Sequence, residues 1–323
     1  MKVSLILTVL NEGESIRGVL DSLAAQTRPP DEVVIADGGS SDDTVAILRS
    51  YAADGRLPLR VIETPGANIS QGRNAAIRLT TGEVIAATDA GVRCAPDWLE
   101  KLIAPFDQPG QASVVAGFFR PDARNAFEIA MGATVLPEAR DVNPETYLPS
   151  SRSVAYIKSA WEAAGGYPEW IDYCEDVIFD LKLRRQAGPF VFVPEAVVYF
   201  RPRGSLGAFA RQYYLYARGD GKANLFGRQH AVRYLTYLIV VPLLIYAAVT
   251  VSPWLWLVGA LAGLAYLRLP LRRLWPRLAP LAWPDRVKAV LYVPIIRVVG
   301  DVAKMIGYPA GCWWRWRRGV GVI

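Results

Sequence analysis

The chain has 323 residues, enough for one large domain or two smaller ones, and 52% of them are hydrophobic. The formal net charge of +6 is unevenly placed, because residues 1–227 carry 23 Lys/Arg against 28 Asp/Glu whereas residues 228–323 carry 13 against 2. Positive charge confined to an apolar, Trp-rich third favours an anionic membrane surface over nucleic acid as the partner.

The N-terminal half alternates short apolar runs with amphipathic segments. Strands are predicted at Val3–Val9, Glu32–Ala36, Leu59–Glu63, Val84–Thr88 and Ser113–Phe119. Helices are predicted at Glu14–Thr27, after the Gly/Ser turn that follows residue 37, and at Gln71–Leu79 and Pro96–Phe106. Unbroken apolar strands alternating with helices favour an α/β fold, an open, mostly parallel sheet flanked by helices.

Ligands of such sheets bind at the carboxyl ends of the strands, and three of these ends carry polar side chains here. The residues concerned are Asn11 and Glu12, Asp37, and Asp89. Any one acid could be a helix cap, but three at successive strand ends predict a pocket. Asp89 is followed by Ala90 and Gly91, which leave space beside its carboxylate.

The C-terminal third contains a long apolar run. Residues 232–267 include a single charged residue, Arg233. One membrane span needs about 20 residues, so this run predicts a helical hairpin at about 234–267 that turns at Ser252 and Pro253. Arginines flank both ends, which places both on the cytoplasmic side. The spans, Tyr234–Thr250 and Trp254–Leu267, are short, so a re-entrant hairpin remains an alternative.

A basic, apolar segment at about 285–318 has the spacing of an interfacial amphipathic helix with a Trp/Arg cluster at headgroup depth. The predicted domains are therefore a catalytic domain at 1–227 and a membrane-associated region at 228–323. The core of a second soluble domain is the alternative for the latter. Three scattered cysteines and a single histidine, His230, exclude a disulfide framework, a cysteine zinc site and His-based triads.

Five segments in order carry a family resemblance. They are TVLNEGESIRGVLDSL, DEVVIADGGSSDDT, GRNAAIRLTTGEVIAATDAG, AAGGYPEW and YCEDVIFDLKLRRQAG. Together they resemble the family 2 glycosyltransferases over roughly residues 1–200. The resemblance implies a nucleotide-binding GT-A fold, often followed by a membrane anchor. Glycine fingerprints of dinucleotide and P-loop sites do not occur in the sequence.

The resemblance implies a site for a nucleoside diphosphate sugar. The implied donor-binding residues are Thr8, Leu10, Asn11, Glu12, Asp37, Gly38, Arg73, Asp89 and Ala90. Asp89 resembles the first acid of the family's Asp-x-Asp motif, which meets a Mg²⁺ or Mn²⁺ ion on the diphosphate. Gly91 stands where a second Asp is frequent, so the cation would depend on Asp89, water and phosphate oxygens.

On the acceptor side, the resemblance places the general base at Asp176, next to Glu175. An acceptor hydroxyl needs such a base, and adjacent carboxylates raise one another's pKa. Gly166, Tyr167 and Arg218 are the expected acceptor-binding residues. No second nucleophile is evident in the sequence, which favours direct displacement with inversion.

These observations predict a membrane-anchored, inverting glycosyltransferase of the hexosyltransferase type. It would act at the cytoplasmic membrane, with its catalytic domain facing the cytoplasm, on a lipid-linked or cell-surface polysaccharide acceptor. Two alternatives are a nucleotidyltransferase that makes a nucleotide sugar and a non-catalytic membrane scaffold. The loop LNEGES lacks the Gly-rich, basic character that the first would show, whereas Gly91 gives the second its support.

Overall fold

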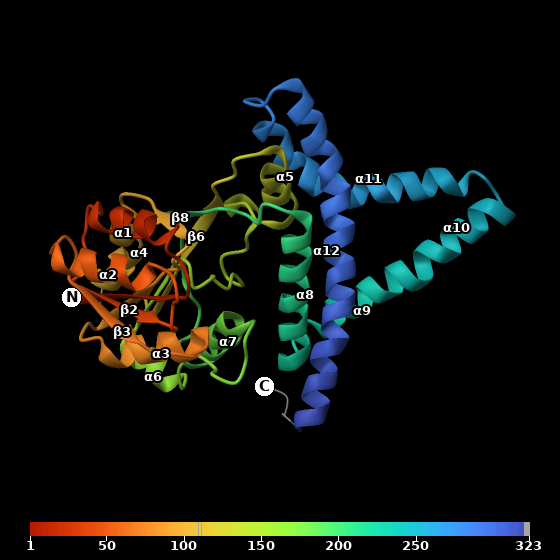
Figure 1. Cartoon of the computed structure of the whole chain (residues 1–323). Coiled ribbons are helices and arrows are strands. Elements are labelled where there is room, and N and C mark those ends of the chain that lie inside the picture. Colours follow the sequence, from red (N-terminus) through yellow and green to blue (C-terminus); the bar gives the residue numbers. More distant parts are fainter. Residues whose placement is uncertain (109, 111, 320–323) are drawn as a thin grey trace. The chain divides into compact units, whose positions relative to one another are not determined.

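Strands and helices alternate through the first 122 residues, as the apolar runs predict. The computed structural model describes residues 1–108, 110 and 112–319. Eight strands form one mixed sheet in the order β3-β2-β1-β4-β7-β6-β8-β5 (Figure 1). The strands are β1 (Val3–Val9), β2 (Glu32–Asp37), β3 (Leu59–Glu63), β4 (Val84–Ala87), β5 (Val92–Cys94), β6 (Val114–Pro121), β7 (Val154–Ile157) and β8 (Val191–Phe200).

The strands that carry the predicted site are parallel. β1 lies between β2 and β4 and pairs in parallel with both, so their carboxyl ends share one edge of the sheet. β7 then joins β4 in the antiparallel sense, and β8 is parallel to β6 but antiparallel to β5. The prediction of a mostly parallel sheet is therefore confirmed for β1–β4, and the remainder of the sheet is mixed.

Helices cover both faces of the sheet (Figure 1). One layer holds α1 (Ile16–Ala24), α2 (Thr44–Ala53) and α4 (Trp98–Ile103), and the other holds α3 (Ile69–Leu79), α6 (Lys158–Ala163) and α7 (Glu175–Ala187). Successive side chains of β1 point to opposite faces of the sheet, so Leu5 and Leu7 pack against the first layer and Ile6 packs against the second.

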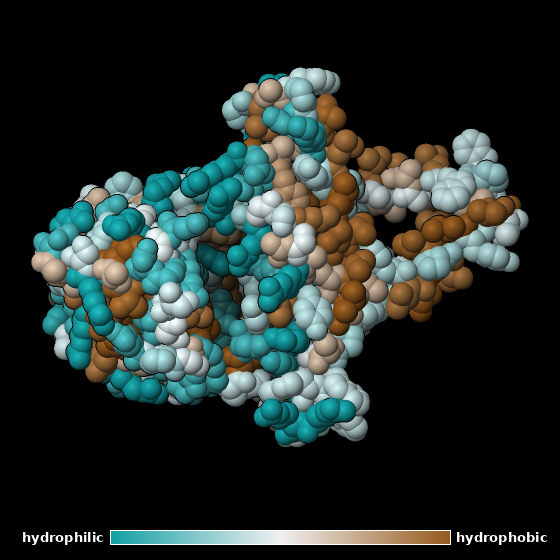
Figure 2. Space-filling view, in the orientation of Figure 1, coloured by the Kyte–Doolittle hydropathy of each residue, from teal (hydrophilic) through white to brown (hydrophobic). Residues whose placement is uncertain are grey.

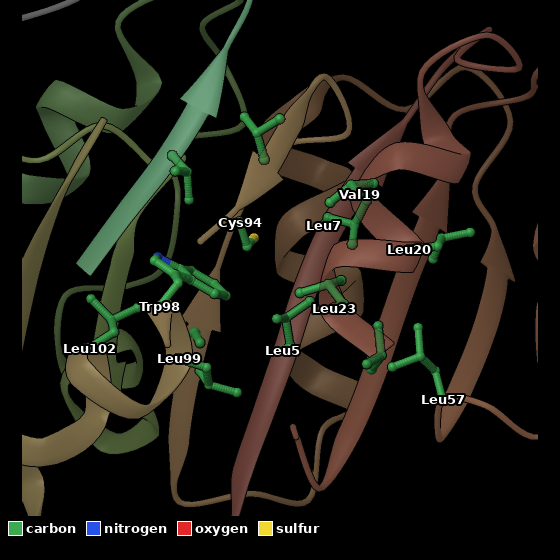
Figure 3. Close-up of a cluster of buried hydrophobic side chains, with 14 of the residues drawn as sticks. Leu5, Leu7, Val19, Leu20, Leu23, Leu57, Cys94, Trp98, Leu99 and Leu102 are labelled. Atoms are coloured by element: carbon green, nitrogen blue, oxygen red, sulfur yellow. The ribbon is translucent and has the colours of Figure 1, made fainter. Parts of the chain in front are cut away.

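The first layer is packed on a fully buried aromatic side chain (Figure 3). Trp98 of α4 is 0% exposed, and its Nε1 donates to Ser153 Oγ at 2.8 Å. Leu5 of β1 and Leu23 of α1 belong to the same buried cluster. Burying each such leucine contributes about 1.5–3 kcal/mol, and this packing holds the carboxyl edge of the sheet in place.

The chain divides into two compact units. The first consists of Met1–Asp122 and Ala139–Arg201 and contains the sheet; the second consists of Ala123–Glu138 and the chain from Pro202 onwards. We predicted a boundary after residue 227, whereas the first unit ends at Arg201. The reason is that α8 (Leu206–Ala223) packs along the long C-terminal helix, and the segment with α5 (Ala126–Val135) packs there too.

That long helix, α12 (Trp283–Arg318), is the frame of the second unit and covers the interfacial helix predicted at about 285–318. It contacts α8 so closely that glycine is required at the crossing. A Cβ at any of three glycines would lie only 2.1–2.2 Å from a backbone oxygen of the opposite helix, namely at Gly221, Gly307 and Gly311. The two backbones are therefore in direct contact.

Two helices of the second unit are long and apolar enough, by length and composition, to cross a membrane. They run over Gly227–Thr250 and Leu255–Arg277, and only 6% of the most apolar window of each is buried. The first contains α9 (Gly227–Leu235), η3 (Thr236–Val240) and α10 (Val241–Thr250); the second contains α11 (Leu255–Leu274) and η4 (Trp275–Arg277). In Figure 2 their surface is a mixture of brown, the colour of hydrophobic residues, and pale, near-neutral residues.

Both helices are longer than the spans predicted from the sequence, which had 17 and 14 residues. They contain 24 and 23 residues, or about 36 and 35 Å at about 1.5 Å per residue. The hydrocarbon core of a bilayer is about 30 Å thick. The difference arises because the helices continue into flanking basic residues that a hydropathy reading leaves out.

Candidate active site

A pocket of about 270 Å³ opens at the carboxyl ends of β1 and β2. Four of the predicted donor-binding residues line it: Thr8, Leu10, Glu12 and Gly38. The sequence analysis did not single out the opposite wall, which comes from the loop after β3 and the start of α3 and includes Thr64, Ala67, Asn68 and Gly72. A Cβ at Gly72 would lie 2.9 Å from Thr8 Cγ2, so glycine lets α3 approach β1 closely.

Asn11 and Asp37 shape the loops beside this pocket. Asn11 has a positive φ of 55° and its Oδ1 accepts from the backbone N–H of Ser41 at 2.8 Å. Asp37 is 1% exposed, and its carboxylate accepts from the N–H groups of Gly39 and Ser40, both at 2.9 Å. Its carboxylate thus stabilises the turn after β2, and its predicted role in binding the nucleotide stays a prediction.

Arg73 is the centre of a second cluster, one residue along α3 from the pocket. Its side chain is 3% exposed, and it donates from Nη2 to Asp89 Oδ1 and from Nη1 to Glu175 Oε1, both at 3.0 Å. Burial alone would lower the pKa of Arg73, but the neighbouring carboxylates outweigh it and raise that pKa. A buried cation thus joins the end of β4 to the start of α7.

Asp89 lies between two arginines. Besides Arg73, the Nε of Arg152 approaches Asp89 Oδ2 at 3.4 Å. Arg152 was not predicted, because no local motif surrounds it and only the fold brings it to the end of β4. The Asp89 side chain is 27% exposed, so it is open on one side, and a Cβ at Gly91 would meet open space. Ala90 between them is buried.

A divalent cation would find one protein carboxylate here. Within residues 1–108, 110 and 112–319, no three His, Cys, Asp or Glu side chains gather as a metal-binding group. The Asp89 carboxylate can be one oxygen ligand of the ion if the ion replaces an arginine, Arg73 or Arg152, that the carboxylate now contacts. Phosphate oxygens and water would then have to complete the six or more ligands that hard cations prefer.

Glu175 and Asp176 begin α7, where the helix dipole favours negative charge. Burial, reinforced by the charge of Asp176, raises the pKa of Glu175 to about 7. Burial also raises the pKa of Asp176, against the attraction of Arg73. Cys174 precedes the pair with φ 68°, a conformation uncommon for a residue with a Cβ and often found at functional sites. Paired carboxyl groups with raised pKa values suit proton transfer near neutral pH.

Gly166 and Tyr167 pack next to the cluster around Arg73. Tyr167 is 1% exposed, lies under Arg73 with 5.2 Å from its ring centroid to Cζ, and stacks on Phe179. Its backbone is clamped by Asn74, whose Oδ1 accepts from Tyr167 N and whose Nδ2 donates to Tyr167 O, both at 2.9 Å. Both residues are buried, and their predicted role in binding the acceptor stays a prediction. Asn74 was missed, although it directly follows Arg73.

Arg218, the remaining predicted acceptor-binding residue, belongs to α8 in the second unit. There it lines a separate pocket with residues of α12. The structure therefore brings together Arg73, Asp89, Glu175 and Asp176, and places the nucleotide-binding candidates Thr8, Leu10, Glu12 and Gly38 around the adjoining pocket.

Comparison with known proteins identifies a family match over the segment that contains part of this site. The profile of the family described as Glycosyl transferase family 2 matches residues 4–141, which include the pocket, Arg73 and Asp89. Residues 4–141 of this chain are therefore similar to glycosyl transferase family 2.

The curated proteins that resemble this chain include glycosyltransferases and a polysaccharide biosynthesis protein. Validoxylamine A glucosyltransferase of Streptomyces hygroscopicus subsp. limoneus is 32% identical over 117 residues, 36% of this chain and 26% of that protein. The O-antigen chain rhamnosyltransferase RfbN of Salmonella typhimurium is 28% identical over 210 residues, 61% of this chain and 66% of that protein. The succinoglycan biosynthesis protein ExoA of Rhizobium meliloti is 25% identical over 268 residues, 78% and 79% of the two chains. The first two matches thus span about a quarter and about two thirds of those relatives.

Solved structures share the fold. The mannosyltransferase PcManGT from Pyrobaculum calidifontis, solved with GDP-Man and Mn²⁺, has a TM-score of 0.63 at 22% identity over 94% of this chain and 87% of its own. TarS residues 1–349 of S. aureus, solved with UDP-GlcNAc, has a TM-score of 0.53 at 20% identity over 92% and 91%. The mixed sheet with its flanking helices is therefore the GT-A fold, as predicted.

Proposed function

We propose that this chain is an inverting glycosyltransferase that moves a hexose from a nucleoside diphosphate sugar to a lipid-linked or cell-surface polysaccharide acceptor. One observation carries the proposal. The buried guanidinium of Arg73 joins Asp89 to Glu175, next to Asp176, beside a pocket at the carboxyl edge of the sheet. Such an edge is where open α/β folds bind their ligands.

The donor is expected to lie across both parts of the site. Its nucleoside occupies the pocket of Thr8, Leu10 and Gly38, and its diphosphate reaches Arg73. Guanidinium groups form paired hydrogen bonds with phosphate oxygens, and Arg73 and Arg152 already face carboxylate oxygens of Asp89. When a Mg²⁺ or Mn²⁺ ion is bound, Asp89 would hold it, and the ion would neutralise charge on the leaving diphosphate.

Asp176 is the proposed general base. It would take the proton of the acceptor hydroxyl as the hydroxyl oxygen attacks the anomeric carbon, while the bond from that carbon to the diphosphate oxygen breaks. A single displacement of this kind inverts the configuration. The raised pKa of Asp176 makes its carboxylate a better proton acceptor than a freely exposed aspartate.

The proposed location is the cytoplasmic membrane, with the first unit on the cytoplasmic side. Two apolar helices with basic flanks support this placement. An enzyme bound to the membrane encounters lipid-linked acceptors by diffusion within the same membrane, which supports an acceptor of this class.

The test is the variant Asp176→Asn. We expect it to bind the nucleoside diphosphate as the wild type does, because the variant leaves the pocket unchanged, and to lose transfer by about 10²–10⁴-fold, because the base is gone. Transfer is measured with membranes and a panel of labelled nucleotide sugars, and binding by the rise in melting temperature with UDP or GDP. The exposed Glu162→Gln serves as the matched control. Full transfer by Asp176→Asn would contradict the assignment.

A further inference from the structure

One face of α12 is apolar and exposed along nearly the whole helix. Its residues follow one another at spacings of three and four, so they share one side of the helix, and none of them is charged. They are Val287, Leu291, Ile295, Val298, Val302, Ile306, Pro309, Trp313 and Trp316, and together they are called the α12 stripe. In Figure 2 hydrophobic atoms lie along the middle of α12.

The rest of the second unit covers the opposite face of α12 and leaves the α12 stripe open. Small and apolar residues on that opposite face are buried, among them Ala289, Val293, Gly300 and Gly307, and they pack against α5 and α8. The residues of the α12 stripe other than Pro309 are 41–73% exposed. A long, contiguous row of exposed apolar side chains marks an interaction surface.

The α12 helix is too long and too charged to cross a bilayer along its own axis. The α12 stripe extends from Val287 to Trp316, about 44 Å at about 1.5 Å per residue, whereas a hydrocarbon core is about 30 Å thick. Arg297, Asp301 and Lys304 lie in its middle, and charged groups are costly at the centre of a bilayer. In the part of the chain that the structure describes, α12 is not among the helices apolar enough to cross a membrane. A bilayer that covers the α12 stripe must therefore lie along the helix.

The candidate membrane hairpin is attached to this middle part of α12. Asp301 accepts hydrogen bonds from Arg233 Nε at 2.8 Å, from the Tyr237 hydroxyl at 3.1 Å and from the Tyr266 hydroxyl. These contacts join α12 to both apolar helices. In Figure 1 α10 and α11 extend away from α12 rather than along it. If they enter a bilayer, α12 lies along its surface, as an interfacial amphipathic helix does.

The charge of α12 and its aromatic end fit an anionic bilayer surface. The helix carries seven Lys/Arg and two Asp, so its net charge is +5 after its own acids are counted. Trp313 and Trp316, 53% and 73% exposed, complete the α12 stripe beside the exposed Arg317 and Arg318. Indole rings are enriched where acyl chains meet headgroups, and basic amphipathic helices bind anionic lipids at this depth.

From these observations we propose that the α12 stripe binds the surface of an anionic lipid bilayer. The helix axis lies parallel to the membrane plane, and the stripe lies at the boundary between headgroups and acyl chains. The sequence predicts an interfacial helix here, and the structure identifies the face that is open to lipid. This inference goes beyond sugar transfer and does not rest on it, because contact between α12 and lipid can be measured on a protein that transfers nothing.

The experiment places a bimane fluorophore on single cysteines of the full chain in liposomes. Leu291→Cys, Val298→Cys and Ile306→Cys are introduced one at a time with Cys312→Ser, since the other two native cysteines are buried. The liposomes contain phosphatidylglycerol and phosphatidylcholine, and some of the lipid carries a nitroxide quencher either near the headgroup or near the end of the acyl chain. We expect the shallow nitroxide to quench all three sites equally, and at least about twofold more than the deep nitroxide, because the helix lies at one depth.

The matched control is Ala208→Cys, at an exposed residue of α8 outside the α12 stripe, and neither nitroxide should quench its label. In liposomes of phosphatidylcholine alone, quenching at the three stripe sites should fall by about twofold or more, because the attraction of the basic helix to anionic lipid is lost. Equal quenching in the two kinds of liposome would overturn the assignment to anionic lipid.

Two further outcomes would overturn the proposal as a whole. Quenching that deepens steadily from Leu291 to Ile306 would show that α12 spans the bilayer. The absence of quenching at all three sites would show that water or a second copy of the chain, rather than lipid, covers the α12 stripe.

Discussion

Arg73 shows how one side chain can organise a site. Its guanidinium holds Asp89 and Glu175 at 3.0 Å each while only 3% of the side chain is exposed. Removing one partner of a buried ion pair typically costs about 3–5 kcal/mol, because the other charge is left uncompensated. If a donor diphosphate binds here as proposed, its oxygens can replace carboxylate oxygens as partners of Arg73, so the guanidinium is not left unpaired.

This exchange leads to a prediction for Asp89→Ala. In the presence of Mn²⁺ the variant should bind the nucleoside diphosphate about tenfold more weakly, a loss of about 1.4 kcal/mol, because it lacks the cation ligand. With EDTA the loss should disappear, because Asp89 no longer contributes a cation ligand and Arg73 and Arg152 are released from it. Calorimetric titration with UDP or GDP, with and without Mn²⁺, checks this.

The control for Asp89→Ala is Glu83→Gln, which changes an exposed acid just before β4. It should leave the affinity for the nucleoside diphosphate unchanged, both with Mn²⁺ and with EDTA. A loss of the same size with Mn²⁺ and with EDTA would contradict a role for Asp89 in holding a cation.

Glu175 gives the wild type a pH-dependent stability. Burial beside Asp176 raises its pKa from 4.5 to about 7. Between these values the native state binds a proton that the unfolded state has lost, so stability falls as the pH rises and the contribution is gone above about pH 7. Glu175→Gln stays neutral at every pH and should not show this fall.

The measurement is the melting temperature of both proteins from pH 5.5 to 8.5. The difference between Glu175→Gln and the wild type should shift in favour of the variant as the pH rises, with Glu162→Gln following the wild type throughout. A difference that stays constant across this range would show that Glu175 titrates at its ordinary pKa.

Among the elements, the crossing of α8 and α12 depends on residues without side chains. Gly311→Ala should destabilise the protein by about 1–3 kcal/mol through overlap with the backbone of α8, even though alanine favours a helix over glycine by about 1 kcal/mol. Gly207→Ala in α8 meets no atom within 4 Å and should be neutral or stabilising. The two variants are compared by urea unfolding of the full chain in detergent. Equal urea midpoints for Gly311→Ala and Gly207→Ala would refute the close crossing.

Sequence patterns predicted the elements whose signal is local. Val3–Val9 and Leu59–Glu63 are strands with the expected bounds. β8 was missed because Pro194 and Glu195 interrupt its apolar run, which is unusual within a sheet.

The site residues were likewise predictable where they stand in local sequence motifs. Arg73, Asp89, Glu175 and Asp176 stand in recognisable motifs, and the fold brings them together. Arg152 and the burial of Tyr167 could not be foreseen, because both depend on contacts between segments far apart in the sequence. The burial of Asp37 behind its own turn likewise requires the three-dimensional path of the loop.

At the scale of the whole molecule, charge and hydropathy separate along the chain. The 13 Lys/Arg of residues 228–323 flank or follow the hairpin, whereas the sheet-containing part is slightly acidic. If residues 228–323 associate with a membrane as proposed, this distribution places their basic residues near anionic headgroups.

The orientation of the hairpin is the last prediction. If both helices cross the bilayer, the turn at Val251, which is 76% exposed, lies on the side opposite to the start of α8. Single cysteines at Val251 and at the exposed Ala208 are introduced with Cys312→Ser, since the other native cysteines, Cys94 and Cys174, are buried. A membrane-impermeant maleimide should label Val251→Cys only in right-side-out vesicles and Ala208→Cys only in inside-out vesicles. Labelling of both from the same side would favour a re-entrant hairpin, because a turn that does not emerge on the far face cannot be reached there.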